Sequence, residues 1–280
     1  MSIKQHIPKP MMTVLLKGYT LYAKCKKSLK IKKCLIDAKL NPSKAVCYCP
    51  CCDNRLRSFE SGYFTRMPNV YNPKRYKGIK QEVVCPICGA IPRHRILATY
   101  FNKHKGELKN KRILYFACES GLWTWMKRNR ISITTADFFA TANLKLDLCN
   151  IVQPDNSWDW IICNHVLEHV DEYKQALNEL YRILKPGGKL IISFPILASL
   201  QTIIEETEHT EKNKKKRLEL YGQADHLRIF GADSKDVLIQ AGFNVDIIDG
   251  SRMDKRIMPV VGPADYDVNY LFLCKKQKGG

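Results

Sequence analysis

Residues 158–195 read WDWIICNHVLEHVDEYKQALNELYRILKPGGKLIISFP, a pattern that predicts a strand, a helix, a turn and a second strand. Residues 158–163 are almost continuously apolar, as expected for a strand covered on both faces. From Tyr173 to Leu184 apolar residues recur every three or four positions, which gives a helix one buried face, and Asp171 is placed to cap it. A unit this short implies a parallel pair of strands with a right-handed crossover.

The turn and the polar residues of this unit indicate a ligand site. Pro186 ends the helix, and Gly187 and Gly188 give the backbone freedom to turn into a strand at residues 190–195. Open α/β sheets bind ligands at the carboxyl ends of their strands. At that end of the first strand the sequence has a polar cluster of Asn164, His165, Glu168 and His169.

Three features carry a resemblance to a known family: Asp159, the NHVLEHV run at residues 164–170 and LKPGG at residues 184–188. Together they resemble the class I S-adenosylmethionine-dependent methyltransferases, in particular the type 11-like subgroup that methylates small molecules and lipids. The resemblance extends from about Arg112 to the C-terminus. It implies an α/β fold with a Rossmann-like seven-stranded sheet, helices on both faces and an antiparallel final strand, and it implies S-adenosylmethionine as the cofactor.

The charge divides the chain into two parts. Before residue 111 there are 23 Lys and Arg against 5 Asp and Glu, whereas the rest of the chain has 23 against 22. This asymmetry indicates RNA or an anionic membrane surface as a partner of the N-terminal part, or only a solvated lysine-rich face. We expect a basic helical segment at residues 1–44, a zinc ribbon at 45–98, and a methyltransferase domain at 99–280 with a substrate-side insertion at 196–231.

No apolar run approaches the ~20 residues of a membrane span, so no transmembrane segment is expected. The run MMTVLL at residues 11–16 is too short for the core of a signal peptide. We therefore expect a cytoplasmic protein, membrane-peripheral if the basic segment binds lipid. In a reducing compartment the twelve cysteines indicate metal ligands or free thiols rather than disulfides.

Two Cys-x-x-Cys pairs predict a metal site. Four thiolates on two tight turns make a closed tetrahedral zinc site of the structural kind. The predicted ligands are Cys49, Cys52, Cys85 and Cys88. Cys47 and Cys51 leave open which thiols of the first pair ligate, and His94 is an alternative ligand, although a surface or interface histidine is the plainer interpretation. Buried or redox-active cysteines are the alternative to a zinc site.

The loop ACESG at residues 117–121 stands where the resemblance implies a glycine-rich loop close to the cofactor. Only Gly121 matches the family pattern, because Ala117 and Glu119 replace the other two glycines. Ala117 is small enough for a close approach, and Glu119 is expected to contact the cofactor's amino group. The helix that begins at Leu122 offers its N-terminus to the cofactor's carboxylate.

Further cofactor contacts follow the next strands, expected at residues 131–136 and 144–146. Asp137 is expected to accept hydrogen bonds from both ribose hydroxyls. The resemblance implies that Asp147 contacts the adenine amine, with the backbone amide of Leu148 beside it, and that Asn164 also binds the cofactor. Each aspartate taken alone would be an ordinary turn or cap residue.

Two histidines are the candidate catalytic residues. Methyl transfer to a hydroxyl needs a base at the moment of attack, and histidine suits that role. His226 lies in the run DHLRIFG at residues 225–231, which resembles a family motif near the active site, and we place His226 and His165 ahead of His169 as the base. The insertion at 196–231 is expected to cover the substrate, and the last strands are expected at residues 244–248 and 266–274.

Three functional hypotheses follow. The first is a methyltransferase that acts on a hydroxyl of a saccharide or another small polar acceptor. The second is an RNA methyltransferase that uses the basic zinc ribbon as an RNA clamp. The third is a non-catalytic binding protein with a methyltransferase fold, which the departures in the loop at residues 117–121 favour.

Overall fold

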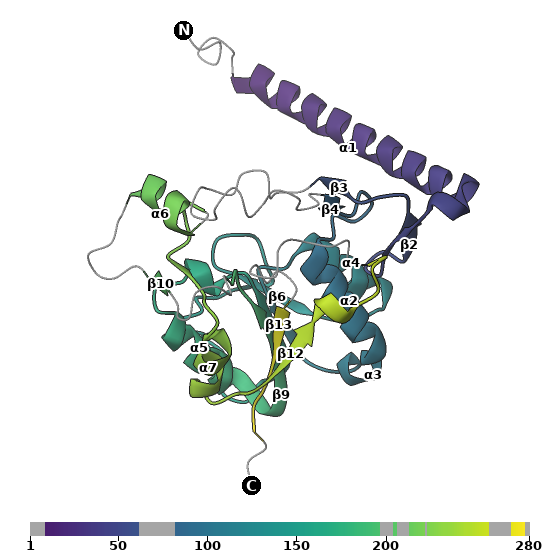
Figure 1. The fold of residues 1–280 in the computed structure, drawn as a ribbon. Coiled ribbons are helices and arrows are strands. Elements are labelled where there is room, and N and C mark those ends of the chain that lie inside the picture. The colour runs from purple at the N-terminus through teal and green to yellow at the C-terminus, as the bar shows by residue number, and fades with distance from the viewer. Residues whose placement is uncertain are drawn as a thin grey trace.

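The computed structural model describes residues 9–61, 82–196, 204–205, 213–221, 223–257 and 270–277. These form a seven-stranded mixed sheet with helices on both faces, small two-stranded sheets and a long N-terminal helix (Figure 1). The expected insertion at 196–231 and the strand expected at 266–274 lie partly outside these residues. The domain boundaries drawn from the sequence stay a prediction.

The sheet has the strand order β12-β13-β9-β8-β5-β6-β7. Its strands pair in parallel except for β13, which is antiparallel to both β9 and β12. The strands are β5 (Ile113–Phe116), β6 (Thr134–Asp137), β7 (Leu144–Lys145), β8 (Trp158–Asn164), β9 (Leu184–Ser193), β12 (Asn244–Asp249) and β13 (Tyr270–Lys275). The predicted Rossmann-like α/β sheet with an antiparallel final strand is therefore confirmed.

Alternation along the central strand directs side chains to two cores. Leu114 and Phe116 of β5 join the core under α5 (Tyr173–Ile183) and α7 (Ser234–Gln240). Ile113 and Tyr115 face the opposite way and pack with α2 (Pro92–Lys103) and α4 (Ser120–Arg128). Helices thus cover both faces, as period-two alternation in a buried strand requires.

The crossover unit differs from the sequence prediction at both ends of α5. The helix begins at Tyr173 after Glu172, and Asp171 makes no cap; its carbonyl instead accepts a hydrogen bond from Arg228 Nη2 at 2.7 Å. At the other end β9 begins at Leu184, before the strand expected from residue 190, but residues 185–188 fall outside the register with β8, because Trp158 pairs with Leu184 and Trp160 with Lys189. The turn expected at residues 186–188 is therefore present as a bulge within the strand, with a φ of +75° at Gly187, and Lys276 exchanges backbone hydrogen bonds with Gly187 and Gly188.

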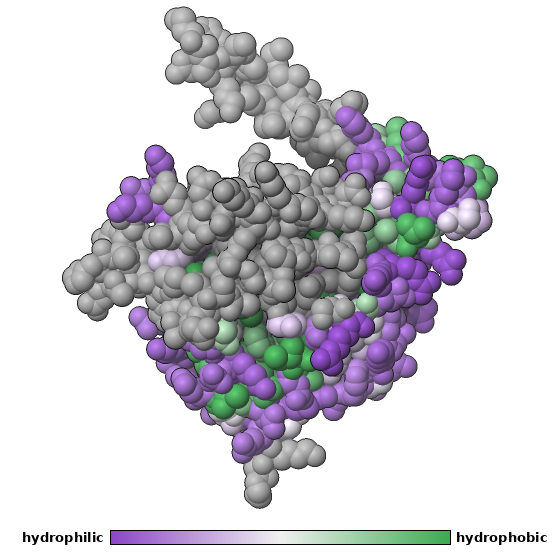
Figure 2. All heavy atoms as spheres, viewed as in Figure 1, coloured by the Kyte–Doolittle hydropathy of each residue, from purple (hydrophilic) through white to green (hydrophobic). Residues whose placement is uncertain are grey.

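The part before the sheet contains α1 (Lys9–Leu40), the hairpin of β1 (Cys47–Cys49) and β2 (Asn54–Leu56), and the pair β3 (Glu60–Ser61) and β4 (Glu82–Val84). In Figure 1 α1 projects from the body and meets it at its C-terminal end, where Lys30 pairs with Glu60 at 2.7 Å. Figure 2 shows hydrophilic residues among a few hydrophobic ones on that end, and the exposed apolar ones are Leu29, Ile36 and Leu40. None of the described helices is long and apolar enough to cross a membrane.

A buried arginine connects this part to the sheet domain. Arg95, on α2, is fully buried, and its guanidinium donates to the carbonyls of Val83, Ala90 and Ile257 at 2.7–2.8 Å. It also lies over the ring of Phe59, 3.9 Å from the centroid. α2 itself starts at Pro92, because proline suits the first helical position.

Candidate functional site

The parallel strands bring the expected cofactor segments to one edge of the sheet. β5 lies between β6 and β8, and its last residue, Phe116, is in register with Ala136 and Cys163. The loop after β5, the end of β6 and the end of β8 therefore adjoin at the carboxyl edge. Open α/β sheets bind their ligands at this edge.

Ala117 adopts a glycine-like backbone conformation. Its φ is +46°, in the left-handed region that residues with a Cβ rarely adopt. Its amide donates a hydrogen bond to the carbonyl of Ala136 at 2.9 Å. Because this conformation costs an alanine roughly 1–2 kcal/mol, the surrounding structure must impose it. The loop thus keeps a tight left-handed turn without the glycine.

Glu119 is paired within the protein. Its carboxylate accepts two hydrogen bonds from the guanidinium of Arg93, and Oε2 lies 2.8 Å from Nε2 of His94. Burial acts to raise the pKa of Glu119, but His94 and Arg93 outweigh it and hold the pKa well below its usual range. The contact expected between Glu119 and the cofactor's amino group therefore competes with this pairing. Sequence reasoning missed both partners, since 26 residues separate Arg93 from Glu119.

Gly121 is required by packing. A Cβ at this position would lie 2.5 Å from Nδ1 of His94 and 2.7 Å from Cα of Ala90. His94 is itself buried and accepts a hydrogen bond from the amide of Ile91 through Nδ1. The one glycine that matches the family pattern thus allows α4 to lie close to the start of α2.

Both expected acids stabilise local turns. Oδ1 of Asp137 accepts hydrogen bonds from the amides of Phe139 and Ala140 at 2.8 and 2.7 Å. Oδ1 of Asp147 accepts from the amide of Cys149 at 2.9 Å, and the neighbouring Leu148 side chain is buried. Each carboxylate keeps a second oxygen for a ligand, so the roles expected for Asp137, Asp147 and Leu148 stay predictions.

Asn164 ends β8 with a buried side chain. Its Oδ1 accepts a hydrogen bond from the hydroxyl of Ser193 at 2.9 Å, and its Nδ2 has no hydrogen-bond partner within the described chain. The next residue, His165, has a φ of +53° and is about one-third exposed. The strand end therefore presents an unused amide donor beside an accessible imidazole.

The other polar residues after β8 lie next to the DHLRIFG segment at residues 225–231. Glu168, in the turn η4 (Leu167–His169), is buried and its Oε1 lies 3.2 Å from Nδ1 of His165. His226 is also buried, and its ring lies edge-on to that of His169 with centroids 4.8 Å apart. Burial acts to raise the pKa of Glu168, yet His165 and the nearby histidines bring it below its ordinary value, and burial lowers the pKa of His226.

The four predicted thiols form one cluster. The Sγ atoms of Cys49 and Cys88 lie 3.7 Å apart and those of Cys52 and Cys85 lie 3.8 Å apart, and all four lie within 4.8 Å of one another. Each pair sits on a turn closed by a backbone hydrogen bond, from the amide of Asp53 to Cys49 and from that of Gly89 to Cys85.

None of the three open alternatives, Cys47, Cys51 and His94, is among the four clustered ligands. The thiol of Cys51 lies beside Cys49 but donates to the carbonyl of His94 at 3.3 Å. The His94 ring is turned to Glu119 instead of the sulfurs. Of the two expected positions, surface or interface, the surface position was wrong, since only 3% of His94 is exposed and it lies between α2 and the loop of Glu119.

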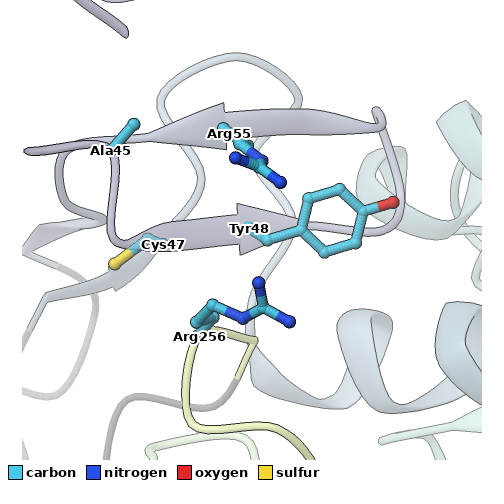
Figure 3. A pocket seen from close by; sticks show the side chains of 5 residues that line it. All are labelled: Ala45, Cys47, Tyr48, Arg55 and Arg256. Atoms are coloured by element: carbon cyan, nitrogen blue, oxygen red, sulfur yellow. The ribbon is translucent and has the colours of Figure 1, made fainter. Parts of the chain in front are cut away.

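A pocket of about 220 Å³ lies at the β1–β2 hairpin (Figure 3). Its walls come from the hairpin and from Arg256, whose carbonyl accepts a hydrogen bond from the amide of Tyr48. The lining residues are Ala45, Cys47, Tyr48, Arg55 and Arg256. None of the residues expected to bind the cofactor lines it, so this pocket is not the candidate active site.

Comparison with known proteins gives a partial match. The family model described as a methyltransferase domain matches residues 125–192. A demethylmenaquinone methyltransferase of Listeria monocytogenes is 37% identical over 65 residues, which are 23% of this chain and 27% of the relative. An uncharacterized protein of Methanocaldococcus jannaschii is 46% identical over 52 residues, 19% of this chain and 21% of that one. The chain thus spans about a quarter of the length of these curated relatives.

Solved structures are similar over a larger part of the chain. An S-adenosylmethionine-dependent methyltransferase from Archaeoglobus fulgidus has 17% identity and a TM-score of 0.44, covering 65% of this chain and 94% of that one. Another from Mesorhizobium loti has 15% identity and a TM-score of 0.44, covering 65% and 98%. Because these TM-scores are low, the fold is assigned from the strand order of the sheet.

The packing of Gly121 makes a prediction about stability. Gly121→Ala should lower the free energy of unfolding by about 1–3 kcal/mol, because the methyl group overlaps His94 and the Ala90 backbone. Gly106→Ala is the matched control, since a Cβ there meets nothing within 4 Å and a helix gains up to about 1 kcal/mol from the exchange. Urea denaturation of both variants measures the difference. Equal stability of the two variants would show that Gly121 is not a packing residue.

Proposed function

We propose that the protein transfers a methyl group from S-adenosylmethionine to a hydroxyl of a small polar acceptor such as a saccharide. The observation that carries the proposal is the convergence at one sheet edge of the left-handed turn at Ala117, the carboxylate of Asp137 and the polar end of β8. The match of residues 125–192 to a methyltransferase domain supports it.

We place the cofactor along this carboxyl edge of the sheet. The backbone of residues 117–121 and the N-terminus of α4 hold its methionine part, where helix amides favour a carboxylate. Asp137 binds the ribose, and Asp147 with the amide of Leu148 binds the adenine. Since Glu119 is ion-paired with Arg93 and contacts His94, it contributes chiefly by fixing the loop. Asn164 offers its unused Nδ2 to the cofactor or the acceptor.

His165 fits the role of base better than His226. Methyl transfer from a sulfonium is an in-line displacement, so the protein aligns the reactants and removes the hydroxyl proton. His165 is accessible, and Glu168 contacts its Nδ1, which leaves Nε2 for the acceptor. His226 is buried and its Nδ1 contacts the carbonyl of Tyr221 at 2.9 Å.

The charges favour a small acceptor over RNA. Asp137, Asp147 and Glu168 lie at or beside the edge, and phosphate contacts dominate the affinity of RNA-binding sites. The basic residues instead gather on α1, where Lys26, Lys27, Lys30, Lys32 and Lys33 are all exposed and Asp37 is the one acid of the helix. This basic helix keeps RNA or an anionic membrane as an alternative partner of the N-terminal part.

We further propose that the four clustered cysteines hold a structural zinc ion. A tetrahedral site with zinc–sulfur bonds of about 2.3 Å has sulfur–sulfur distances of about 3.8 Å, and the two measured distances of 3.7 and 3.8 Å agree with this value. Four thiolates around one zinc leave a net negative charge, which the buried guanidinium of Arg95 offsets from α2.

The zinc proposal predicts a loss of metal. Cys85→Ser combined with Cys88→Ser should remove the zinc bound at this site and lower the thermal midpoint, because two of the four ligands are gone. Cys163→Ser is the control, since this buried cysteine lies in the sheet away from the cluster. Elemental analysis with a sulfhydryl titration measures both. Stoichiometric thiolate-bound zinc in the double variant would refute the assignment.

The cofactor proposal predicts a selective loss of affinity. Asp137→Asn keeps an oxygen for the turn at residues 138–140 but removes the charge that binds the ribose. The loss of a charge-assisted hydrogen bond, about 1.5–3 kcal/mol, should weaken S-adenosylhomocysteine binding roughly 10- to 100-fold. Asp236→Asn, on an exposed position of α7, should bind as the wild type does. Calorimetry measures the affinity of each variant for S-adenosylhomocysteine. Absence of binding to the wild type at millimolar ligand would favour the non-catalytic hypothesis.

The acceptor proposal predicts transfer into a small molecule. With isotopically labelled S-adenosylmethionine, label should appear in a member of a saccharide and small-hydroxyl panel, and His165→Gln should lower kcat at least about 100-fold by loss of the base. Total RNA serves as the competing acceptor. Transfer into RNA, with binding that weakens steeply as salt rises, would replace the saccharide by RNA.

A further inference from the structure

The segments around Glu168 and His226 bring together three side chains that can bind a metal ion. Glu168, His169 and His226 each offer one ligand atom, and these atoms lie within 4.8 Å of one another. The two segments are fixed to each other by the backbone, because the amide of Leu227 donates to the carbonyl of Glu168 at 2.8 Å. The cluster lies directly after β8, beside the proposed acceptor site.

The hydrogen bonds of both imidazoles leave the same nitrogen available. Nδ1 of His226 lies 2.9 Å from the carbonyl oxygen of Tyr221, and Nδ1 of His169 lies 3.2 Å from that of Asp225. A carbonyl oxygen only accepts, so each Nδ1 must carry the proton. In a neutral ring Nε2 then has the lone pair, which is the arrangement found in metal-binding histidines.

Two buried atoms of the cluster have no partner. Oε2 of Glu168 and Nε2 of His226 make no hydrogen bond within the described chain, although their residues are only 1% and 3% exposed. Leaving such atoms unpaired is costly, and a cation bound by both would satisfy them together. His165 contacts the other carboxylate oxygen and so orients Oε2.

We propose that Glu168, His169 and His226 bind a divalent transition-metal ion such as zinc. Two neutral imidazoles and one carboxylate form a ligand set typical of zinc and non-haem iron, with coordination positions left for water or a substrate oxygen. Ligand atoms of a bound ion lie about 3.4 Å apart for bonds near 2.1 Å, so the side chains must draw in slightly. His169 has the room to do so, because it is about one-third exposed.

This site is distinct from the cysteine cluster and its existence does not depend on methyl transfer. If the proposed function also holds, the ion lies where an acceptor hydroxyl would approach, and its charge would lower the pKa of that hydroxyl beside His165.

A titration of metal-stripped protein with Co²⁺ tests the proposal. Cobalt at the cysteines gives an intense thiolate charge-transfer absorption, whereas cobalt bound to nitrogen and oxygen gives only weak visible bands, so one titration separates the sites. Wild-type protein should bind two equivalents, and the Cys85→Ser, Cys88→Ser variant should keep the weak-band site.

Glu168→Gln, which keeps the shape of the side chain, should weaken the weak-band site about 100-fold or more and leave the charge-transfer band unchanged. His169→Gln, at a more exposed position, gives the same test if the first variant does not fold, and His104→Gln, at the residue after α2, is the control. Calorimetry with S-adenosylhomocysteine on the same samples reports the proposed function separately. A wild-type protein without the weak bands, or weak bands that are unchanged in Glu168→Gln and His169→Gln, would overturn the proposal.

Discussion

The buried guanidinium of Arg95 is the contact that joins the cysteine part to the sheet domain. Its hydrogen bonds reach β4, the second cysteine turn and Ile257, three segments far apart in the sequence. A guanidinium has several N–H donors in a fixed geometry, so one side chain can bind carbonyls from all three segments. The preceding residues of α2, Arg93 and His94, bind Glu119 in the candidate cofactor loop. One turn of α2 therefore connects the clustered thiols to the proposed cofactor site.

This connection explains the departures of the loop from the family pattern. A loop rich in glycine approaches a ligand without side chains, whereas here Ala117 is held in a left-handed conformation and Glu119 is tied back to α2. Cys51, the neighbour of the clustered cysteines on the first turn, also contacts the carbonyl of His94, so the cysteine turns and the loop are connected through α2. The part of the chain before the sheet therefore contacts the candidate cofactor loop through packing.

Features encoded by local pattern could be predicted from the sequence, and features set by distant partners could not. Hydrophobic runs were enough for the strands at the centre of the sheet, and Cys-x-x-Cys spacing was enough for the thiol cluster, whereas the seven-stranded sheet with its antiparallel last strand followed from the family resemblance. The cap at Asp171 failed because Arg228 binds the backbone there. The turn at residues 186–188 is present as a bulge in β9, but its backbone pairing with Lys276, far along the chain, could not be predicted. The contacts of Glu119 with Arg93 and His94 could likewise not be predicted from the residues around Glu119.

Arg228 resembles Arg95 in its role, because it too is a buried arginine that donates hydrogen bonds to several backbone carbonyls. Its guanidinium donates to the carbonyls of Leu167, Val170 and Asp171, all in the irregular segment between β8 and α5. That segment carries His165 in a left-handed conformation together with Glu168 and His169. Strained or irregular backbone persists only where surrounding contacts determine it. A buried arginine therefore supports each candidate site, and the chemistry-bearing side chains can occupy loops while keeping fixed positions.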